Sequence, residues 1–323
     1  MLRVTQLSGF GIGSGEVTIP GTLTATAGAY SLTGTAATIT KATATNKTLT
    51  AGAGAYSLTG AAAGLTKAGS MSSEATAFLA RTSGLDTTHI NAYVALIDGL
   101  VADGIWAKLD VLHVYATQDS TTARLNLVST SYPATLSGSP TFTADRGYTG
   151  VESSFTIYID TGFNPTTASS PKYVLNSAHL SVWNVTDVAS NNSAIGAQDG
   201  SANSAYIIVK YAGGSTYFRI NTGNVGSGSY AAPNTTGHYI GNRTGSGGTV
   251  NYRNGTAVAT ESVASSTLPN GKVYTLGGAS NGVNVIGVGN QQAMASIGSS
   301  LNGTEAGNFY TRLRTYMTAV GVP

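Results

Sequence analysis

The sequence predicts a mainly β protein, in which an antiparallel β-sandwich with a few packed helices follows a small region of β-repeats. Three observations lead to this fold class: an internal repeat near the start, helical periodicity in the next stretch, and many short alternating segments between glycine turns over most of the rest. We therefore expect three parts: a β-repeat and anchoring region at 1–70, a helical connector at 71–105, and the sandwich with a C-terminal helix at 106–323.

The composition excludes several classes of protein. The chain has 323 residues, 41% of them hydrophobic, which is enough for a sizeable core and too many for a disordered tail. Only 9% of the residues are charged and the formal net charge is +2, which is too small for an electrostatic grip on nucleic acid. Because there is no cysteine, neither disulfides nor thiolate metal sites can form.

The chain shows no signal for export or membrane insertion. Its start, MLRVTQLSGFGIGSGEV, lacks the continuous apolar segment of a signal peptide. No apolar run reaches the roughly 18 residues that a transmembrane helix needs. The low charge and the abundance of Thr, Ser and Gly are nevertheless typical of extracellular β proteins. A virion component that is assembled in the host cytoplasm and released by lysis satisfies both observations.

The first 70 residues contain a repeat with a period of 26 residues. Leu23 recurs as Leu49, the segment AGAYSLTG at 27–34 recurs at 53–60, and Ile39 is matched by Leu65. Constant spacing of this kind indicates repeated supersecondary units, in this case Thr-rich strands with Gly turns. The units carry few large apolar residues, so we expect them to pack against another chain, a larger assembly or the rest of the protein. A flexible Ala/Gly/Thr linker is the alternative.

The helical connector follows the repeats. Ser72 or Ser73 can cap a short helix. A longer helix is expected from about Thr87 to Asp103, with Gly104 just after its end. The residues that can cap this helix are Asp86, Thr87 and Thr88. An apolar stripe predicts that the helix packs on a sheet, and its members are Ile90, Tyr93, Val94, Ile97, Leu100 and Val101.

A third helix is expected near the C-terminal end of the chain. Thr304 can cap it and Gly321 ends it. One face of this helix carries the apolar residues Phe309, Leu313, Tyr316, Met317 and Val320. Because helices bracket the β-rich block, we expect them to pack together beside the sandwich.

Residues 106–300 have the pattern of many short strands. The alternation of Phe155, Ile157 and Ile159 with polar residues predicts a half-buried strand. Asn-Gly pairs tolerate positive φ and predict type I′ hairpin turns at 254–255, 270–271 and 281–282. Turns at this spacing indicate an antiparallel sandwich or barrel. The expected strands are Lys108–Tyr115, Arg124–Val128, Phe155–Ile159, Tyr173–Val185, Ala205–Tyr211, Thr216–Asn221, His238–Asn242, Val250–Arg253, Val273–Leu276 and Val283–Val288.

Three segments of this block resemble a concanavalin A-like or LamG-like jelly-roll domain of bacteriophage and prophage virion proteins. They are AKLDVLHVYATQDSTTARLNLVS (107–129), TFTADRGYTG (141–150) and YIDTGFNP (158–165). The tail ASIGSSLNGTEAGNFYTRLRTYMTAVG (295–321) is similar to the closing strand and helix of that family, and the repeats are similar to N-terminal modules of phage fibre and decoration proteins. The resemblance implies a fold and a setting, and it contains no catalytic signature.

No catalytic residues are expected. Jelly-roll glycosidases use carboxylates clustered on one strand, whereas the 14 acidic residues of this chain are scattered, with Glu152 and Asp160 as the nearest candidates. The segment GASNG at 278–282 matches G-x-S-x-G, but it lies between predicted strands and is interpreted as a hairpin turn. The segment GFGIGSG at 9–15 resembles a phosphate loop only in composition and is interpreted as an arm. We therefore expect no hydrolysis of glycans or esters.

Neither a zinc site nor a cofactor is expected, because the four histidines (His89, His113, His179 and His238) are far apart in the sequence. Calcium enters through the resemblance, since LamG-like and lectin-like relatives bind it with loop Asp and Asn oxygens. The richest loop of this kind contains Asp187, Asn191, Asn192, Asp199 and Asn203. A polar turn is the favoured interpretation of this loop, and its calcium candidates are Asp187, Asp199 and Asn203.

Sugar binding is the remaining hypothesis for a site. Lectin surfaces combine aromatic platforms with amide and carboxylate hydrogen-bonding groups, and the chain has 17 tyrosines. Those near Asn- and Ser-rich turns are Tyr206, Tyr211, Tyr217, Tyr230 and Tyr239. Tyrosine is also enriched at subunit interfaces, so the sequence alone does not choose among these residues.

The leading hypothesis for function is a non-enzymatic structural protein of a phage virion: a fibre, spike or capsid-decoration subunit whose jelly roll faces outward. The repeats would anchor or oligomerise the chain, and a homotrimer is the preferred oligomer. The expected partners are other virion proteins and host-surface polysaccharide. One alternative is a carbohydrate-binding receptor module, and another, with less support, is a glycan hydrolase.

Overall fold

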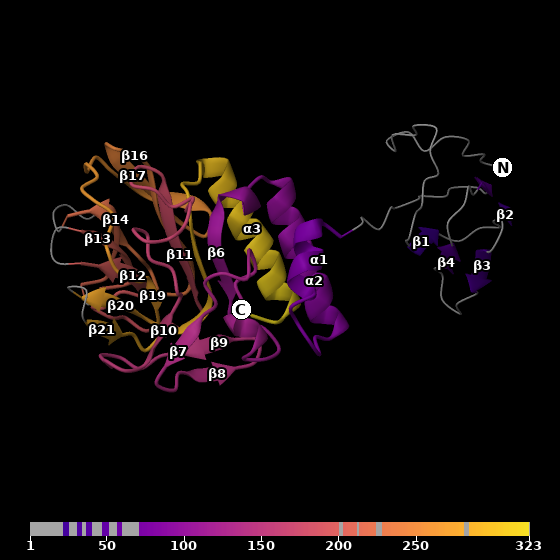
Figure 1. The fold of residues 1–323 in the computed structure, drawn as a ribbon, viewed down its shortest axis with the longest axis horizontal. Helices are drawn as coiled ribbons and strands as arrows, with labels where there is room; N and C mark the ends of the chain where they lie inside the picture. Colours follow the sequence, from indigo (N-terminus) through magenta and orange to yellow (C-terminus); the bar gives the residue numbers. More distant parts are fainter. Residues whose placement is uncertain are drawn as a thin grey trace. The chain divides into compact units, whose positions relative to one another are not determined.

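The structure, a computed structural model, divides into two units, Met1–Met71 and Ser72–Pro323 (Figure 1). It describes the backbone of five short strands before residue 60, and then residues 71–199, 203–211, 213–223, 228–280 and 284–322. The expected arm at 9–15 and the expected turn at 281–282 lie outside the described residues. The helices that follow residue 72 belong to the same unit as the sandwich.

In the first unit, strand pairs join equivalent residues of the two repeats. The strands are β1 (Thr22–Ala25), β2 (Ser31–Thr33), β3 (Ala37–Thr40), β4 (Lys47–Ala51) and β5 (Ser57–Thr59). β1 pairs antiparallel with β4, where Leu23 lies opposite Leu49, and β3 adds to the other edge of β4. β2 pairs antiparallel with β5, where Leu32 lies opposite Leu58. Each copy of the repeat therefore pairs with the other copy with local two-fold symmetry.

The second unit has three layers: helices, a middle sheet and an outer sheet. The middle sheet has eight strands in the order β18-β17-β16-β11-β22-β9-β8, with β6 also paired to β22. Its strands are β6 (Leu109–Val114), β8 (Thr141–Thr143), β9 (Gly147–Thr149), β11 (Ala178–Asn184), β16 (Gly237–Gly245), β17 (Gly248–Arg253), β18 (Thr256–Glu261) and β22 (Gln291–Gly298).

The outer sheet has seven strands in the order β15-β14-β13-β12-β19-β10-β7. They are β7 (Thr135–Ser137), β10 (Tyr158–Asp160), β12 (Ile195–Gln198), β13 (Ser204–Ile208), β14 (Ser215–Thr222), β15 (Gly228–Ala231) and β19 (Tyr274–Thr275). A separate hairpin is formed by β20 (Gly277–Ser280) and β21 (Asn284–Gly287). All of these pairings are antiparallel, so the expected fold class, an antiparallel β-sandwich with packed helices, is confirmed.

Three helices lie on one side of the middle sheet: α1 packs on α2, α2 packs on α3, and α3 lies next to β6 in Figure 1. They are α1 (Ser73–Leu79), α2 (Thr87–Ala102) and α3 (Gly303–Ala319), and short 3-10 turns occur at Trp106–Lys108 and Thr122–Arg124. The Ser72 hydroxyl caps α1 and the Asp86 carboxylate caps α2, as two of the expected caps. Gly104 adopts φ +71° after α2, as expected for a C′ residue.

Two features of the helices differ from expectation. Asn302, not Thr304, caps α3, because its side chain and that of Glu305 form a reciprocal capping box. Ile90 does not belong to the buried stripe of α2 and is 36% exposed, whereas Leu96, which was not in the expected stripe, is buried. The stripe is therefore displaced by part of a turn from the expected one.

The unit has two hydrophobic cores, one on each side of the middle sheet. The first lies between the helices and the sheet and contains Phe78, Tyr93 and Phe309. The second lies between the two sheets and contains Leu180, Val182 and other strand residues. Because alternate residues of a strand point to opposite faces, β6 and β11 are buried along their whole length.

Several expected strands are wrong or shorter than expected. Residues 124–128 make no strand: Asn126 forms only an isolated bridge with His113, and its side-chain amide donates to the carbonyls of Asp110 in β6 and of Ser131 in the following loop. The strand expected from Phe155 begins at Tyr158, and Phe155 itself is 63% exposed. The strand expected from Tyr173 begins at Ala178, after a turn.

Among the expected Asn-Gly turns, the one at 254–255 is confirmed, with φ of +49° and +76° between β17 and β18. The turn at 270–271 is wrong, because neither residue has positive φ and the segment does not join paired strands. Instead the backbone N–H of Asn270 bonds to the Asp199 carboxylate.

Candidate functional site

The face of the outer sheet that points away from the sandwich is rich in tyrosine. The inner face of the same sheet fills the core between the sheets with Ile159, Ile195, Ile207 and Phe218. Each of these residues is flanked along its strand by residues that point the opposite way. The result is an outward surface with residues from five adjacent strands, β10, β19, β12, β13 and β14.

Five residues on this surface form one straight row across five strands. Asp160 lies opposite Tyr274, and Tyr274 lies opposite Gly196. Gly196 in turn lies opposite Tyr206, and Tyr206 lies opposite Arg219. We call Asp160, Tyr274, Gly196, Tyr206 and Arg219 the tyrosine row. The row places one aromatic ring on each side of Gly196, which has no side chain, and one charged residue at each end.

Glycine is required at the centre of the row because the neighbouring backbone comes too close. A Cβ atom at Gly196 would lie 2.4 Å from the Cβ of Tyr206 and 2.8 Å from the carbonyl oxygen of Ala205. The Arg219 guanidinium lies over the Tyr206 ring, 5.3 Å from the ring centroid. This cation–π contact fixes the ring at one end of the row.

The other end of the row carries a paired charge. The Lys272 Nζ donates to Asp160 Oδ2 at 2.6 Å, and Asp160 Oδ1 accepts from the backbone N–H of Gly162 at 2.8 Å. The hydrogen bond to Asp160 raises the pKa of Lys272. The Asp160 carboxylate is therefore held in place with its charge neutralised.

Further tyrosines lie on one side of the row. Tyr158 meets the Tyr274 ring edge-on at a centroid distance of 5.2 Å. Tyr217 precedes Arg219 by two residues on β14 and meets Tyr211 edge-on at 5.6 Å. Because β10 and β14 run in the same direction, Tyr158 and Tyr217 flank the same side of the row. On the other side, Gln198 and Lys272 supply polar groups.

The hydroxyl groups of the row stay protonated at neutral pH. Burial raises the pKa of Tyr206, and burial followed by the nearby Asp160 charge raises the pKa of Tyr274. Both phenols are therefore available as hydrogen-bond donors as well as stacking surfaces.

The structure brings together three of the five tyrosines that the sequence singled out, namely Tyr206, Tyr211 and Tyr217. Tyr239 is instead fully buried and donates to the carbonyl of Asn234 at 2.7 Å. Tyr230 packs against the core between the sheets. Sequence reasoning missed Tyr158 and Tyr274 as site residues. The alternation along their strands nevertheless places each of them on the face that points away from the core.

The calcium candidates bond to two different loops. Asp187 Oδ1 accepts from the backbone N–H and the hydroxyl of Thr235 at 2.8 and 3.1 Å. Asp199 Oδ2 accepts from the backbone N–H of Asn270 at 2.7 Å, and Asn203 Oδ1 accepts from the Thr267 hydroxyl. The partner of Asp187 thus lies in the loop before β16, whereas the partners of Asp199 and Asn203 lie in the segment 267–270. Calcium binding stays a prediction.

The residues considered for catalysis have structural partners. Glu152 accepts from the Ser190 hydroxyl, the Asn192 amide and the backbone N–H of Gly289 at 2.8 to 3.1 Å. The Gly-x-Ser-x-Gly segment begins in β20, which pairs with β21, so a strand follows it and not the helix of a nucleophile elbow. The carboxylates of Glu152 and Asp160 thus have separate partners.

The four histidines are all buried, and two of them, His179 and His238, pack on the same ring, that of Phe309. His113 and His179 have pKa values lowered to about 4 by burial, and burial lowers the pKa of His238 to about 3. His89 bonds to two carboxylates, those of Asp86 and Asp145. Within the described residues no group of three or more His, Asp or Glu side chains is placed to hold a metal ion.

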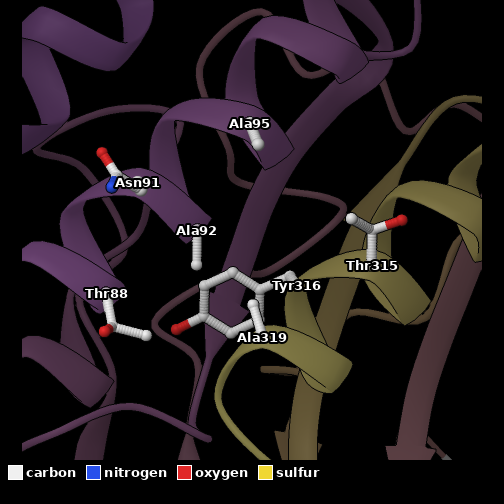
Figure 2. Close-up of a pocket in the computed structure, with 7 residues that line it drawn as sticks. All are labelled: Thr88, Asn91, Ala92, Ala95, Thr315, Tyr316 and Ala319. Carbon is white, nitrogen blue, oxygen red and sulfur yellow. The ribbon is translucent and has the colours of Figure 1, made fainter. Parts of the chain in front are cut away.

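A cavity of about 320 Å³ lies between α2 and α3. Figure 2 shows the Tyr316 ring amid its lining, with Thr88, Asn91, Ala92 and Ala95 from α2 and Thr315 and Ala319 from α3. The Tyr316 hydroxyl donates to the carbonyl of Ala116 at 3.0 Å. The lining therefore offers mainly small side chains, with few polar groups to orient a ligand, and the tyrosine row is the better candidate site.

In the part of the chain that the structure describes, no helix is long and apolar enough to cross a membrane.

No protein-family model and no curated protein matches the sequence. Solved structures resemble it distantly. Domain 4 of AbnA, a GH43 extracellular arabinanase from Geobacillus stearothermophilus, solved with arabinotriose, is 15% identical with a TM-score of 0.35 over 62% of this chain and 98% of that one. The binding domains of Paraclostridial Mosquitocidal Protein 1 and of botulinum neurotoxin serotype D are 11% and 10% identical, each with a TM-score of 0.43 over 64% of this chain and 52% of theirs. The chain thus spans about half the length of these toxin domains, and the likeness concerns the β-sandwich fold alone.

Proposed function

We propose that the chain is a non-enzymatic carbohydrate-binding protein and that the tyrosine row is its binding face. The observation that carries this proposal is the register that aligns Asp160, Tyr274, Gly196, Tyr206 and Arg219 across five strands. A sugar ring has apolar C–H faces and a rim of hydroxyl groups. The row offers aromatic rings to the faces, and Asp160 at its end and Gln198 and Lys272 on its polar side to the hydroxyls.

The side chains of the row also favour binding over catalysis. Its carboxylate, Asp160, is paired with Lys272, and glycoside hydrolysis needs two carboxyls at a defined separation. A rigid sheet with in-register side chains holds a preformed surface, so little order has to be gained when a ligand binds. These properties suit recognition of a glycan without turnover.

The experiment is a glycan array probed with the full chain, followed by affinity electrophoresis in gels that contain the polysaccharides that score. Tyr206→Ala and Tyr274→Ala should each weaken binding by about tenfold or more, equivalent to about 1.4 kcal/mol. The matched control is Tyr310→Ala, which removes a partly buried tyrosine of α3 that stacks on Trp183, away from the tyrosine row. Circular dichroism checks that the variants are folded.

Two results would overturn this proposal. One is that the full chain binds no glycan on a broad array. The other is that Tyr206→Ala abolishes self-association of the chain, measured by sedimentation, and leaves glycan binding unchanged, which would make the row a subunit interface.

The setting of this activity remains the virion role inferred from the sequence, as a fibre, spike or decoration subunit. An outward jelly roll with a sugar-binding face would suit contact with host-surface polysaccharide. Detection of the chain by mass spectrometry in purified phage particles tests this setting independently of the binding assays.

A further inference from the structure

The shape of the tyrosine row says more about the ligand than its composition does. The row runs across the strands of the sheet, and adjacent strands are about 4.8 Å apart. Tyr274 and Tyr206 are separated by one strand, so their positions on the sheet are about 10 Å apart, and the row from Asp160 to Arg219 covers about 19 Å. A single sugar ring cannot cover both tyrosines.

The row continues past one of its ends. Thr135 on β7 lies opposite Asp160 in the same register, and its side chain is short and exposed. A chain lying along the row can therefore run on past Asp160 to the edge of the sheet. A binding face of this form does not need the end of a sugar chain.

The centre of the row carries no formal charge. Tyr274, Gly196 and Tyr206 are uncharged, and the neighbouring Tyr158 and Tyr217 on the flank are uncharged as well. Of the two charged ends, Asp160 is paired with Lys272 and Arg219 is stacked on Tyr206. Between the two ends the row therefore offers aromatic faces and hydroxyl groups, without a formal charge. The Arg219 guanidinium keeps its positive charge at one end, over the Tyr206 ring.

From these observations we infer that the ligand is a linear, uncharged polysaccharide, bound along its interior, with sugar faces on Tyr274 and Tyr206 and the chain passing over Gly196. This inference rests on the proposed function and specifies its substrate class. The absence of a side chain at Gly196 is what allows one continuous chain to contact both rings.

The test is calorimetry on the full chain with length series of cello-, xylo-, manno-, malto- and laminari-oligosaccharides, from disaccharides to octasaccharides. For the series that binds, affinity should rise by about tenfold or more between disaccharide and hexasaccharide and then level off. Reduction of the terminal sugar to its alditol should leave the affinity of the longest members unchanged. Tyr206→Ala and Tyr274→Ala should flatten the length dependence, and Tyr310→Ala should keep it.

The outcomes separate this inference from the function on which it rests. A monosaccharide that binds as tightly as a hexasaccharide, or binding that is lost on reduction of the chain end, overturns interior binding while carbohydrate binding stands. Binding only to alginate or polygalacturonate, with loss at high salt, overturns the uncharged ligand. If neither the array nor any oligosaccharide is bound, the proposed function itself fails.

Discussion

Gly196 and Tyr206 lie directly opposite each other on β12 and β13, and a methyl group at Gly196 would meet the Cβ of Tyr206 at 2.4 Å. The glycine therefore allows the close approach of the two strands and leaves the centre of the tyrosine row without a side chain. Under the proposed function, stability and glycan binding both depend on this position.

We predict that Gly196→Ala destabilises the protein and weakens glycan binding together. The added methyl must displace backbone and the start of the Tyr206 side chain, at a cost of about 1–3 kcal/mol. Urea unfolding measures the stability, and affinity electrophoresis measures the binding. The control is Gly213→Ala, in the turn that follows β13, where an added Cβ meets nothing within 4 Å.

An unchanged affinity in Gly196→Ala, with the fold intact, would show that a ligand does not cross the centre of the row. Through the unfolded chain alone, Gly→Ala stabilises a protein by about 0.4–1 kcal/mol, so Gly213→Ala should not lower the stability. Equal destabilisation by Gly196→Ala and Gly213→Ala would therefore show that the strand contact at Gly196 adds no cost of its own.

Local signals account for the parts of the fold that sequence reasoning predicted. Helix α2 has a capping Asp86 and a terminal Gly104, and each acts within a few residues of the helix end. The cap of α3 was misplaced because Thr304 and Asn302 are both capping residues, and the reciprocal bond with Glu305 decides between them.

The tyrosine row could not be predicted in the same way. Its register joins Tyr274 to Gly196 and to Asp160, which are far apart in the sequence, and strand order is a property of the whole sandwich. Alternation predicts which face Tyr206 occupies and says nothing about which residue lies beside it. Sequence reasoning therefore predicted the type of residue, tyrosine near turns, but not which tyrosines lie together in the site.

The second prediction concerns His89, which is 5% exposed and joins α2 to the turn between β8 and β9. Its Nδ1 lies 2.8 Å from Asp86 Oδ1 and its Nε2 lies 2.7 Å from Asp145 Oδ1. Burial lowers the pKa of His89, but the hydrogen bonds to Asp145 and Asp86 outweigh burial and the net pKa is raised. The protonated imidazolium is thus favoured in the folded state. Asp119 is a further carboxylate that interacts with it electrostatically.

Because the pKa of His89 is raised in the folded state, its imidazolium contributes fully to the free energy of unfolding below the pKa of the unfolded chain, about 6.5. This contribution is lost as the pH rises through the pKa of the folded state. His113, His179 and His238 have lowered pKa values and the opposite dependence, so the quantity to measure is a difference. The free energy of unfolding of His89→Gln should fall below that of the natural protein by about 1–3 kcal/mol near pH 6, and the gap should narrow toward pH 9. A gap that widens toward pH 9 would contradict the imidazolium.

The third prediction contrasts two glycines with positive φ. At Gly255 (φ +76°) an added Cβ would lie 3.1 Å from the Cα of Gly307 and 3.1 Å from the Cβ of Tyr310, where the β17–β18 turn packs on α3. At Gly104 (φ +71°) an added Cβ meets nothing within 4 Å.

Gly104→Ala should therefore cost only the backbone strain, about 1 kcal/mol. Gly255→Ala should cost that strain and, in addition, about 1–3 kcal/mol for displacing α3. Urea unfolding of the two variants gives the comparison. Equal losses in the free energy of unfolding would show that a Cβ at position 255 makes no costly steric contact with α3.

The last prediction tests the pairing of the two repeats. Leu23 lies opposite Leu49 and Leu32 lies opposite Leu58, so strands of one repeat meet the same strands of the other within a single chain. Directly opposed residues of antiparallel strands have Cα atoms about 4.5–5.5 Å apart, which is within the range of a disulfide. Since the natural chain has no cysteine, two introduced thiols can react only with each other or with another copy.

We expect Leu23→Cys/Leu49→Cys to oxidise to an intramolecular disulfide, seen as loss of both free thiols with an unchanged mass on a non-reducing gel. Leu23→Cys/Leu58→Cys is the matched control and should keep its thiols, because those residues belong to different strand pairs. A covalent dimer or trimer from the first variant would show that the repeats pair between chains, as the homo-oligomer inferred from their thin core requires. A monomer with an intramolecular disulfide would mean that the two repeats of one chain pair with each other. Any trimer must then form through other surfaces.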